Sequence, residues 1–499
     1  MLDHTNLMVP DSAHEQLRDQ YDHLVGGTWR EPADRDYFET ENPATERSLT
    51  SVAAGTKPDV DRAVETATDA FPAWRDTDPV TRGQRVGAVA DRIRSRLDEF
   101  AAIESLDQGK PLSQAKAELS GAARYFEYYG GVADKIEGKS IPVGADAVDY
   151  TVRQPYGVSA QIIPWNLPGN LFARGVAPAL VTGNTVVVKP APTTPLSAFH
   201  LAELCHEAGV PEGAVNVVAG GGEAGEALTR HEGVDSITFT GSVETGQRVM
   251  EAASRSVTPV TLELGGKNPA IVSPDADLNA AVDAIEVGIF TNAGQVCSAA
   301  DRALVHESVY EEFVDRIAAA AASYDLGAGI DDPDMGPLNS AGHLEKVASY
   351  LDLGRTEGAT VVTGGDVPDC EGHFVEPTVF ADIDNDMRIA QEEIFGPVLV
   401  VIPFDDETDG IEVGNDVAYG LTAGVFTNDL QRAHRAARRL EAGNVYVNQW
   451  FGDTNQTPFG GWKQSGIGRE KGLAALESYL QTKNVAIDLS EGGGGAPGA

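Results

Sequence analysis

Short runs of β-branched and aliphatic residues alternate with amphipathic stretches from Asp149 onwards. The runs GVSAQIIPW, NTVVVKP, VNVVAG, SITFTG and VTLELGG are separated by segments with helical spacing, such as 196–208 and 243–253. Short apolar strands that alternate with helices are typical of βαβ units and a parallel sheet. This part of the chain therefore predicts a doubly wound α/β unit.

A second series of the same kind follows the motif LELGGKNP. Its predicted strands are NPAIV, RALVHE, ATVVTGG, EPTVFADI, PVLVVIPF, GLTAGVFT and GNVYVNQW, and its predicted helices cover 277–290, 308–323 and 429–441. We expect the boundary between the two units near Gly265–Gly266. The first 135 residues or so have mostly helical periodicity, as in VDRAVETATDAFPAW. The final SEGGGGAPGA is of low complexity and predicts a disordered tail.

The charge of the chain is strongly acidic. Its 499 residues, enough for two or three domains, include 76 Asp and Glu against 37 Lys and Arg, a net charge of -39. This sign argues against binding to nucleic-acid phosphates. Self-repulsion that keeps a protein soluble is one explanation. Adaptation to molar salt, where screening shortens to about 3 Å, is the one we favour, because the acidic residues are spread along the whole chain.

Targeting signals and cysteine pairs are both missing from the sequence. No apolar run reaches the length that crosses a bilayer, and MLDHTNLMVPDSAHEQLRDQ lacks the basic and apolar segments of a secretory signal. Cys205, Cys297 and Cys370 cannot form a complete disulfide set and have no metal-ligand spacing. We therefore expect a cytoplasmic protein with no metal site and no membrane association.

One cysteine, Cys297, lies in the polar segment NAGQVCSAADR between a predicted helix and a predicted strand. A lone cysteine is usually a buried and inert side chain, but this setting also fits an exposed nucleophile. A cysteine nucleophile needs an activating base and an oxyanion donor. Glu263 ends VTLELGG and Asn166 lies in IIPWNLPGN, although each alone could be a solvated strand-end carboxylate or an Asx turn.

Seven motifs in order make the pattern specific: IIPWNLP, VVVKP, FTGSVETG, LELGGKNP, NAGQVCSAADR, QEEIFGPV and PFGGWKQSGIGRE. Over roughly residues 20–487 the chain resembles the NAD(P)-dependent aldehyde dehydrogenase superfamily, of the hydrolytic, non-acylating type. The resemblance implies that Cys297 is the nucleophile, Glu263 the base that activates water, and Asn166 the oxyanion donor. It also implies that Glu470, in GIGRE, assists proton relay.

The same resemblance implies a dinucleotide site. AGGGEAG follows a strand and opens a helix, but an isolated glycine pattern of this kind does not establish such a site in a glycine-rich chain. The resemblance instead assigns the pyrophosphate to FTGSVETG, at a helix N-terminus that favours anions. Lys189 alone could be an ordinary strand-end lysine. The implied cofactor residues are Ile162, Pro164, Trp165, Lys189, Pro192, Gly225, Gly241, Ser242, Gly246, Leu264, Glu393 and Phe395.

One departure bears on the choice of cofactor. Relatives that prefer NAD often have a glutamate three residues after the lysine, where this chain has Pro192. Proline has no carboxylate to hold a 2′-hydroxyl group or to repel a 2′-phosphate. We therefore expect NADP to be accepted as well as NAD, or in preference to it.

The substrate is inferred from Arg174, which stands eight residues after Asn166. Relatives that oxidise succinate semialdehyde have an arginine there, which can hold a carboxylate, but a structural arginine on the helix is the alternative. Their second arginine is here Thr291, and Asp453 and Trp450 in NQWFGDTNQTPFGG fit an anionic substrate poorly. We expect an ω-semialdehyde acid, succinate or 2-oxoglutarate semialdehyde, with Arg174 and Phe459 as substrate contacts; the alternative is a neutral aliphatic or aromatic aldehyde.

Two other functions are conceivable on the same fold. An enzyme that passes the thioester to coenzyme A is disfavoured because Glu263, which serves water activation, is retained. A non-catalytic binding protein is disfavoured because the cysteine, glutamate and asparagine are all present.

The implied architecture has a cofactor domain, a catalytic domain and a β extension that pairs between subunits, since a free sheet edge is otherwise a liability. We expect a homodimer or homotetramer. The expected ranges are 1–136 with 156–264 for the Rossmann-like cofactor domain, 265–475 for the catalytic domain, 137–155 with 476–490 for the extension, and 491–499 for the disordered tail.

Overall fold

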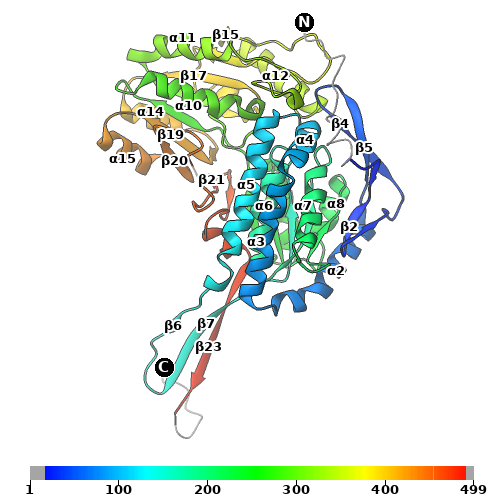
Figure 1. The fold of residues 1–499 in the computed structure, drawn as a ribbon. Helices are drawn as coiled ribbons and strands as arrows, with labels where there is room; N and C mark the ends of the chain where they lie inside the picture. Colours follow the sequence, from blue (N-terminus) through cyan, green and yellow to red (C-terminus); the bar gives the residue numbers. More distant parts are fainter. Residues whose placement is uncertain (1–16, 453, 491–499) are drawn as a thin grey trace.

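The computed structural model describes residues 17–452 and 454–490, and the predicted disordered tail lies outside them. Two α/β units, each built around a mostly parallel sheet, lie one above the other in Figure 1, and a β arm projects from the lower one. The predicted mixed α/β class with two parallel sheets is confirmed. The domain limits themselves stay predictions.

The first sheet has five parallel strands at its centre, in the order β12-β11-β8-β9-β10. Antiparallel β2 (His23–Val25) and β3 (Thr28–Arg30) extend one edge, and β22 (Gly466–Ile467) pairs with β12 at the other, with Glu263 opposite Gly466. The central strands are β8 (Val158–Ile162), β9 (Thr185–Lys189), β10 (Val215–Val217), β11 (Ser236–Thr240) and β12 (Val260–Glu263).

Helices cover both faces of this sheet, which explains why its strands are apolar throughout. In β9, Val186 and Val188 enter one core while Val187 enters the other. Because successive side chains of a strand point to opposite faces, a strand buried on both sides needs the continuous run TVVVK. The helices are α2 (Lys57–Arg75), α3 (Pro79–Ser95), α4 (Leu97–Gln108), α5 (Leu112–Gly130), α6 (Pro168–Val181), α7 (Leu196–Glu207), α8 (Gly222–Thr229) and α9 (Val243–Ser254).

The second sheet has the strand order β15-β16-β17-β14-β13-β19-β20, parallel except for β15. One large core fills the space between this sheet and its helices. The strands are β13 (Pro269–Val272), β14 (Arg302–His306), β15 (Thr360–Thr363), β16 (Thr378–Ala381), β17 (Val398–Phe404), β19 (Thr422–Phe426) and β20 (Asn444–Val447). The helices are α10 (Leu278–Phe290), α11 (Tyr310–Ala321), α12 (Ala341–Glu357), α13 (Arg388–Gln391), α14 (Glu407–Asn415) and α15 (Leu430–Arg439).

The mostly helical prediction for the first 135 residues is wrong before Lys57. Besides β2 and β3, the strands β1 (Gln20–Tyr21), β4 (Tyr37–Asn42) and β5 (Arg47–Ala53) precede the helices, and β1, β5 and β4 form a small sheet. The pairing of β4 with β5 shifts register between Thr40 and Glu41. Short strands interrupted by a bulge do not show the period-two alternation by which a strand is predicted.

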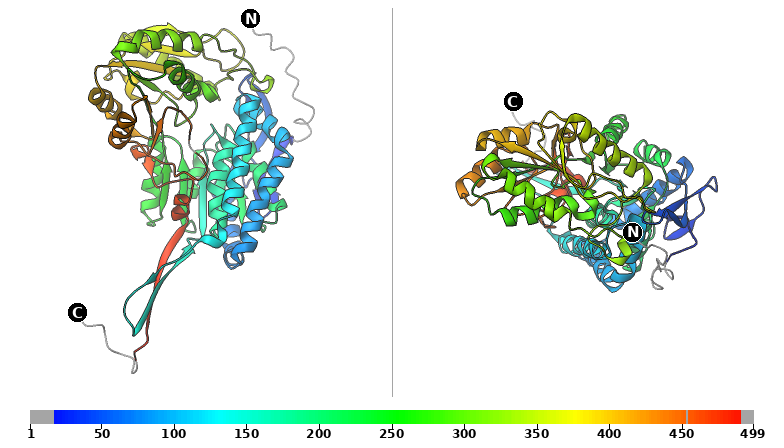
Figure 2. Two further views of the ribbon diagram at one scale, coloured as in Figure 1. Left: turned by 60° about the vertical axis from the view of Figure 1, so that its left-hand side comes forward. Right: turned by 90° about the horizontal axis from the view of Figure 1, so that it is seen from above.

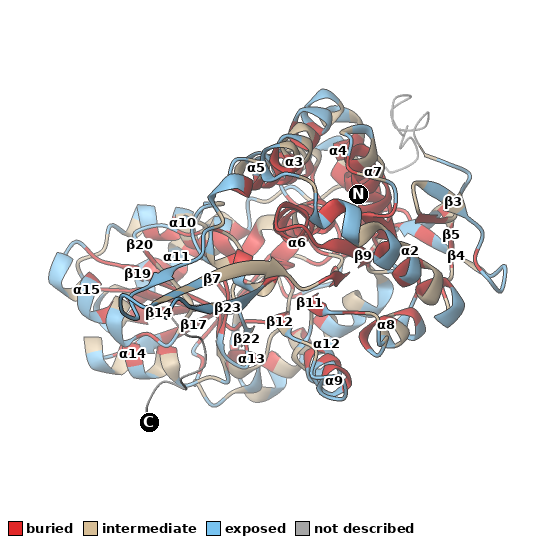
Figure 3. Cartoon of the chain, turned by 90° about the horizontal axis from the view of Figure 1, so that it is seen from below, coloured by how far each residue is buried: buried red, intermediate tan, exposed pale blue. Residues whose placement is uncertain are grey.

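A three-stranded arm projects from the lower unit, as both Figure 1 and Figure 2 show. β7 (Ala147–Pro155) pairs antiparallel with β23 (Leu480–Asp488) along its whole length, and β6 (Ser140–Ile141) pairs with β7. Its side chains are mostly exposed or half-buried, in contrast to the buried strands of the first sheet (Figure 3). Among the helices of the described residues, none combines the length and apolar composition of a membrane span.

Candidate active site

Cys297 follows a strained turn at the end of α10. In this turn, η2 (Thr291–Gly294), Asn292 and Ala293 both have a φ of 53°. Left-handed backbone costs a residue with a side chain about 1–3 kcal/mol and persists only where other contacts hold it. One such contact is the bond of 3.0 Å from Asn292 Nδ2 to the carbonyl oxygen of Asn166. The turn therefore brings Cys297 to the carboxyl ends of the first sheet's strands.

The structure brings three predicted site residues to one cavity of about 220 Å³. Asn166 comes from the loop between β8 and α6, Glu263 is the last residue of β12, and Cys297 follows the turn. Ligands of parallel sheets bind at the carboxyl ends of the strands, where all three lie. Other predicted residues on the wall of this inner cavity are Pro164, Trp165, Arg174, Gly241, Ser242, Leu264, Glu393 and Phe395.

Asn166 is fixed by bonds on both its backbone and its side chain. Its Nδ2 donates to the carbonyl oxygen of Gln295 at 2.9 Å, and its own carbonyl oxygen accepts from Lys110 Nζ at 3.0 Å. Lys110 is buried and forms ion pairs with Glu104 and Glu118. Lys110 was not predicted as a site residue, because it lies in the N-terminal helical segment and reaches Asn166 only through the tertiary fold.

Burial dominates the electrostatics of the thiol. It raises the pKa of Cys297 to about 12; the positive charge of Arg174 works in the opposite direction, and Glu393 and Glu263 add to the rise. The thiolate is the nucleophilic form of cysteine. In the free protein Cys297 is therefore a protonated thiol at neutral pH.

Glu263 is a buried carboxyl group without a fixed partner. Burial and the charge of Glu470 raise its pKa well above the ordinary value, and Arg174 opposes the rise. Among the described residues, neither carboxylate oxygen of Glu263 has a hydrogen-bond partner. A carboxylate with a raised pKa and free lone pairs is suited to accept a proton near neutral pH.

Glu470 and Phe459 lie behind Arg174 and are not on the cavity wall. Arg174 forms a close ion pair with Glu470 and lies 3.8 Å from Glu263. Its guanidinium carbon lies 4.5 Å from the centre of the Phe459 ring. Backbone bonds in both directions join Phe459 and Glu470. Phe459 thus contacts Arg174, which lines the cavity, and its role as a substrate contact stays a prediction.

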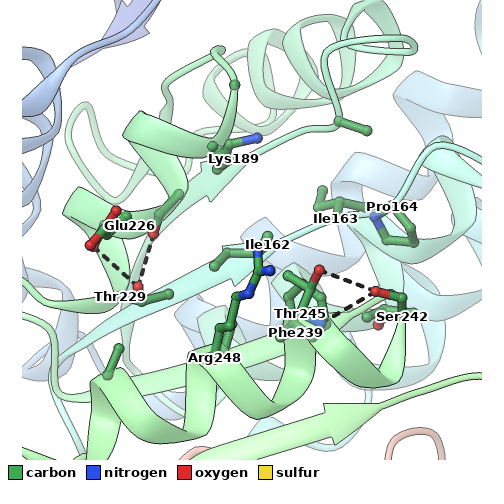
Figure 4. A pocket seen from close by; sticks show the side chains of 18 of the residues that line it. Ile162, Ile163, Pro164, Lys189, Glu226, Thr229, Phe239, Ser242, Thr245 and Arg248 are labelled. Atoms are coloured by element: carbon green, nitrogen blue, oxygen red, sulfur yellow. Dashed lines mark hydrogen bonds between the residues drawn. The ribbon is translucent and has the colours of Figure 1, made fainter.

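A second, larger cavity of about 690 Å³ opens along the same strand ends (Figure 4). At one side lies the N-terminus of α9, where the Ser242 hydroxyl accepts a bond from the N–H of Thr245 at 3.3 Å. Exposed N–H groups at a helix start favour an anion such as a pyrophosphate. The predicted residues on its wall are Ile162, Pro164, Trp165, Lys189, Pro192, Gly225, Gly241 and Ser242.

The two cavities form one continuous surface, since Pro164, Trp165, Thr240, Gly241 and Ser242 line both. Gly241 has no room for a side chain, because a Cβ there would lie 2.5 Å from the ring of Phe239. An elongated dinucleotide with phosphates at the helix start and its reactive end near Cys297 fits this surface.

Lys189 is the buried cation of the larger cavity. Its Nζ donates to the carbonyl oxygen of Pro190 at 3.0 Å, and burial lowers its pKa to about 8. Arg230 and Arg248 also line this cavity, and Figure 4 shows the Arg248 side chain extending toward Ile162. Neither arginine was predicted, because solvated helix arginines are common and carry no motif.

Two of the predicted cofactor residues contact each other. A Cβ on Gly246 would lie 2.6 Å from Leu264, so the glycine allows α9 to pack closely against that side chain. Gly246 is absent from the walls of both cavities, whereas Leu264 lines the inner one. Gly246 therefore allows close packing of α9, and its role at the cofactor stays a prediction.

Glu393 and Phe395 form the opposite wall of the inner cavity. Glu393 Oε1 accepts a bond of 2.9 Å from the N–H of Gly266, and burial raises the pKa of Glu393 to about 7. Phe395 has a φ of 64°, and its carbonyl oxygen lies 2.7 Å from Nε2 of His343. The ring of Trp165 packs edge-on against both aromatic rings. His343 and also Lys346 line this cavity, although no sequence motif marked them.

Trp450 faces the core and does not line the inner cavity, contrary to the expected loop wall. Its Nε1 donates to the carbonyl oxygen of Ser298 at 2.9 Å, and its ring packs against Gly288 and Gly424. Trp450 thus supports the residue after Cys297 from behind. Asp453, expected in the same loop, lies outside the described residues.

A thiol, an amide donor and a carboxylate meet in a cavity that continues into a larger one, and these are the groups that covalent attack on a carbonyl carbon needs. The chain belongs to the aldehyde dehydrogenase family, whose profile matches residues 29–485. It is an enzyme that oxidises aldehydes with a nicotinamide dinucleotide as cofactor.

Individual relatives are similar to this chain over nearly its full length. The chain is 43% identical over 472 residues to an aldehyde dehydrogenase of Aspergillus niger, covering 94% of this chain and 95% of the relative. It is 43% identical to a hydroxyisobutyraldehyde dehydrogenase of Mycolicibacterium austroafricanum, covering 93% of each. Its fold matches the NAD+ complex of an aldehyde dehydrogenase from Bacillus cereus with a TM-score of 0.96 and 42% identity, covering 97% of this chain and 100% of the other.

Proposed function

We propose that the protein oxidises a neutral aldehyde to its carboxylic acid with NAD+ or NADP+, through a thioester on Cys297 that water hydrolyses. The observation that carries this proposal is the inner cavity, on which Cys297, Asn166 and Glu263 meet and which continues into the larger cavity. The nucleophile Cys297, the oxyanion donor Asn166 and the base Glu263 thereby lie on the wall of one cavity.

In the first half of the reaction, the Cys297 thiol releases its proton to solvent, its sulfur bonds to the aldehyde carbon, and the carbonyl oxygen becomes an oxyanion. The Asn166 amide and the N–H of Cys297 stabilise that oxyanion. A dinucleotide held by the residues of the larger cavity would supply the acceptor for the hydride that the carbon gives up as its C–H bond breaks. The carbon is then held as a thioester on Cys297.

In the second half, Glu263 takes a proton from water while the water oxygen bonds to the thioester carbon. The C–S bond breaks, the acid is released, and the leaving Cys297 thiolate takes up a proton to restore the thiol. Glu470 shares Arg174 with Glu263, which supports the second carboxyl group expected in the proton relay. A buried base beside the nucleophile favours water over coenzyme A as the acceptor. It also disfavours a non-catalytic role.

A neutral substrate is favoured by the chemistry of the cavity and of the relatives. The hydroxyisobutyraldehyde of the relative named above has no carboxylate. The expected ω-semialdehyde acids depend on Arg174, which already contacts two carboxyl groups. The test is a spectrophotometric screen of hexanal, benzaldehyde, betaine aldehyde and succinate and 2-oxoglutarate semialdehydes. The proposal fails if only the acids react, or if product appears only with added coenzyme A.

We infer that NADP+ is accepted alongside NAD+. Pro192 lines the larger cavity with no carboxylate, and the buried cation of Lys189 lies on the same wall. An additional phosphate there would meet positive charge and no repulsion from residue 192. Comparable kcat/KM values for the two cofactors would support this, and Pro192→Glu should then reduce NADP+ use selectively. Absence of NADP+ turnover by the wild type would contradict it.

We also infer a salt-rich cytoplasm as the setting. The net charge of -39 and the need of Cys297 for a reduced thiol support it. A reducing compartment keeps such thiols free.

The arm supports association with a second copy. It exposes the apolar side chains of Ile141, Val148, Tyr150 and Ile487, and within the described residues its outer strands β6 and β23 are each paired on one side only. An exposed apolar strand edge is usually buried by another element or another protein chain. We infer a homodimer or homotetramer, which light scattering coupled to gel filtration would distinguish from a monomer.

A further inference from the structure

Arg174 is an isolated charge on an apolar helix. It is the one charged residue of α6 (Pro168–Val181), nearly all of which is buried, and Arg174 itself is only 6% exposed. A buried charge is strongly unfavourable unless it is paired. The ion pairs that stabilise Arg174 therefore indicate its role.

Its partners are the two carboxyl groups of the hydrolytic site. The guanidinium contacts Glu470 closely and lies 3.8 Å from Glu263, and both carboxyl groups are buried. One face of the guanidinium lies over the ring of Phe459, with its carbon 4.5 Å from the ring centre. Packing of this kind fixes the plane of an arginine. The guanidinium that would bind a substrate carboxylate thus already faces two carboxyl groups of the protein.

The balance of charge points the same way. Burial alone would lower the pKa of Arg174, but the charges of Glu470 and Glu263 raise it above its ordinary value. The guanidinium of Arg174 faces two carboxyl groups, so a third carboxylate from a substrate would compete with them for the same cation. A neutral aldehyde brings none.

We propose that Arg174 is a positioning residue which holds Glu470 behind Glu263 and supplies the positive charge of the hydrolytic site, and that it does not recognise a substrate carboxylate. This inference rests on the proposed function and narrows its substrate class. It replaces the clamp role expected from the sequence.

Opposite effects on the pH profile follow for the two partners. Arg174 lowers the pKa of Glu263, whereas Glu470 raises it. Removing Arg174 should therefore move the acidic limb of kcat to higher pH, and removing the charge of Glu470 should move it to lower pH. Other charged or titratable groups that act on this site are Arg469 and Lys471 on Glu263, and Tyr125 and Cys297 on Arg174.

The experiment compares Arg174→Met, Arg174→Lys and Glu470→Gln with the wild type. The limb of Arg174→Met should rise by about one pH unit or more, with a fall in kcat of about tenfold at neutral pH for hexanal and succinate semialdehyde alike. Arg174→Lys should restore most of the shift, and Glu470→Gln should shift the limb downward. Arg94→Met, which removes an exposed arginine paired with Glu127, is the matched control and should leave the limb in place.

A second readout does not need turnover. Because Arg174 also lowers the pKa of Cys297, alkylation of that thiol by iodoacetamide should require higher pH in Arg174→Met. A rise in KM for succinate semialdehyde alone, with the pH profile and alkylation unchanged, would overturn the inference and restore the clamp. If the wild type oxidised no aldehyde, the proposed function would fail. The alkylation profile would still decide whether Arg174 sets the charge of the site.

Discussion

The side-chain amide of Asn166 donates a hydrogen bond of 2.9 Å to the carbonyl oxygen of Gln295, in the segment that leads to Cys297. An amide group has two hydrogens to donate. One is held by this bond, which orients the side chain and leaves the other for the oxyanion that we propose forms at Cys297. The side-chain amide of Asn166 is thus oriented before any substrate binds.

Replacing Asn166 with alanine removes one of the two oxyanion donors. We expect kcat/KM to fall by about 10²–10³-fold, because loss of one such donor costs about 2.7–4 kcal/mol of barrier in other enzymes. Steady-state kinetics with the best aldehyde measures it. Asn170→Ala is the matched control, since Asn170 lies four residues further on, in α6, and lines neither cavity. An equal loss in both variants would argue against an oxyanion role for Asn166.

Alkylation of Cys297 in the free enzyme should become faster with rising pH well beyond neutrality. Burial raises the pKa of this thiol to about 12, so the thiolate fraction keeps increasing throughout the alkaline range. Mass spectrometry after timed iodoacetamide treatment follows the modified peptide, with Cys297→Ser as the blank. A rate that levels off below pH 8 would show that the free enzyme already holds a thiolate.

Glu263→Gln should form the thioester and fail to hydrolyse it. The amide cannot take a proton from water, whereas attack by Cys297 does not use this side chain directly. Stopped-flow absorbance should record a burst of about one reduced cofactor per subunit, followed by a steady rate at least about a hundredfold below the wild type. If the burst also disappears, Glu263 is needed for the first half of the reaction as well.

Asp59 is expected to stabilise the fold in a pH-dependent way. Burial would raise its pKa, but the contacts with His23 and the backbone N–H groups of Thr56 and Ala33 lower it to about 2. A depressed pKa in the folded state stabilises above the unfolded value of about 3.9 and is lost as pH falls toward 2. Asp59→Asn should therefore cost about 1–3 kcal/mol of unfolding free energy at neutral pH.

Urea unfolding at pH 7 and at pH 3.5 measures this effect, which should be smaller at the lower pH. Asp61→Asn is the control, because Asp61 pairs with the exposed Lys57 on the surface of the same helix. That change should alter stability by less than about 0.5 kcal/mol. Equal costs for the two substitutions would mean that burial of Asp59 adds nothing.

Salt should stabilise the protein if its charge is an adaptation to high ionic strength. Raising KCl from 0.1 M to 1 M shortens the screening length from about 10 Å to about 3 Å and weakens the repulsion among 76 acidic residues. We expect Tm to rise by several degrees, and activity to rise with it. Calorimetry with sucrose as a non-ionic control checks the cause. A Tm that is constant or falls would leave solubility as the explanation of the charge.

Local sequence patterns predict the elements that are buried on both faces or amphipathic over several turns. The expected helix 196–208 corresponds to α7, Leu196–Glu207, and TVVVK forms β9. The strands before Lys57 escaped prediction because they are short and interrupted by a bulge. Motifs likewise marked the side chains around Cys297. The partners of Arg174 could not be predicted, because Glu470 reaches it only after the chain has passed through the second sheet.

That return of the chain has a further consequence. β22 pairs with β12 directly beside Glu263, and the same short segment continues to Glu470. Thermal fraying of this edge pair would loosen Glu263, the last residue of β12, while the turn before Cys297, held by Asn166, stayed intact. At raised temperature the enzyme would then still form the thioester on Cys297 but would not hydrolyse it. The first effect of heating would then be accumulation of the acyl-enzyme, at temperatures below those at which the cores unfold.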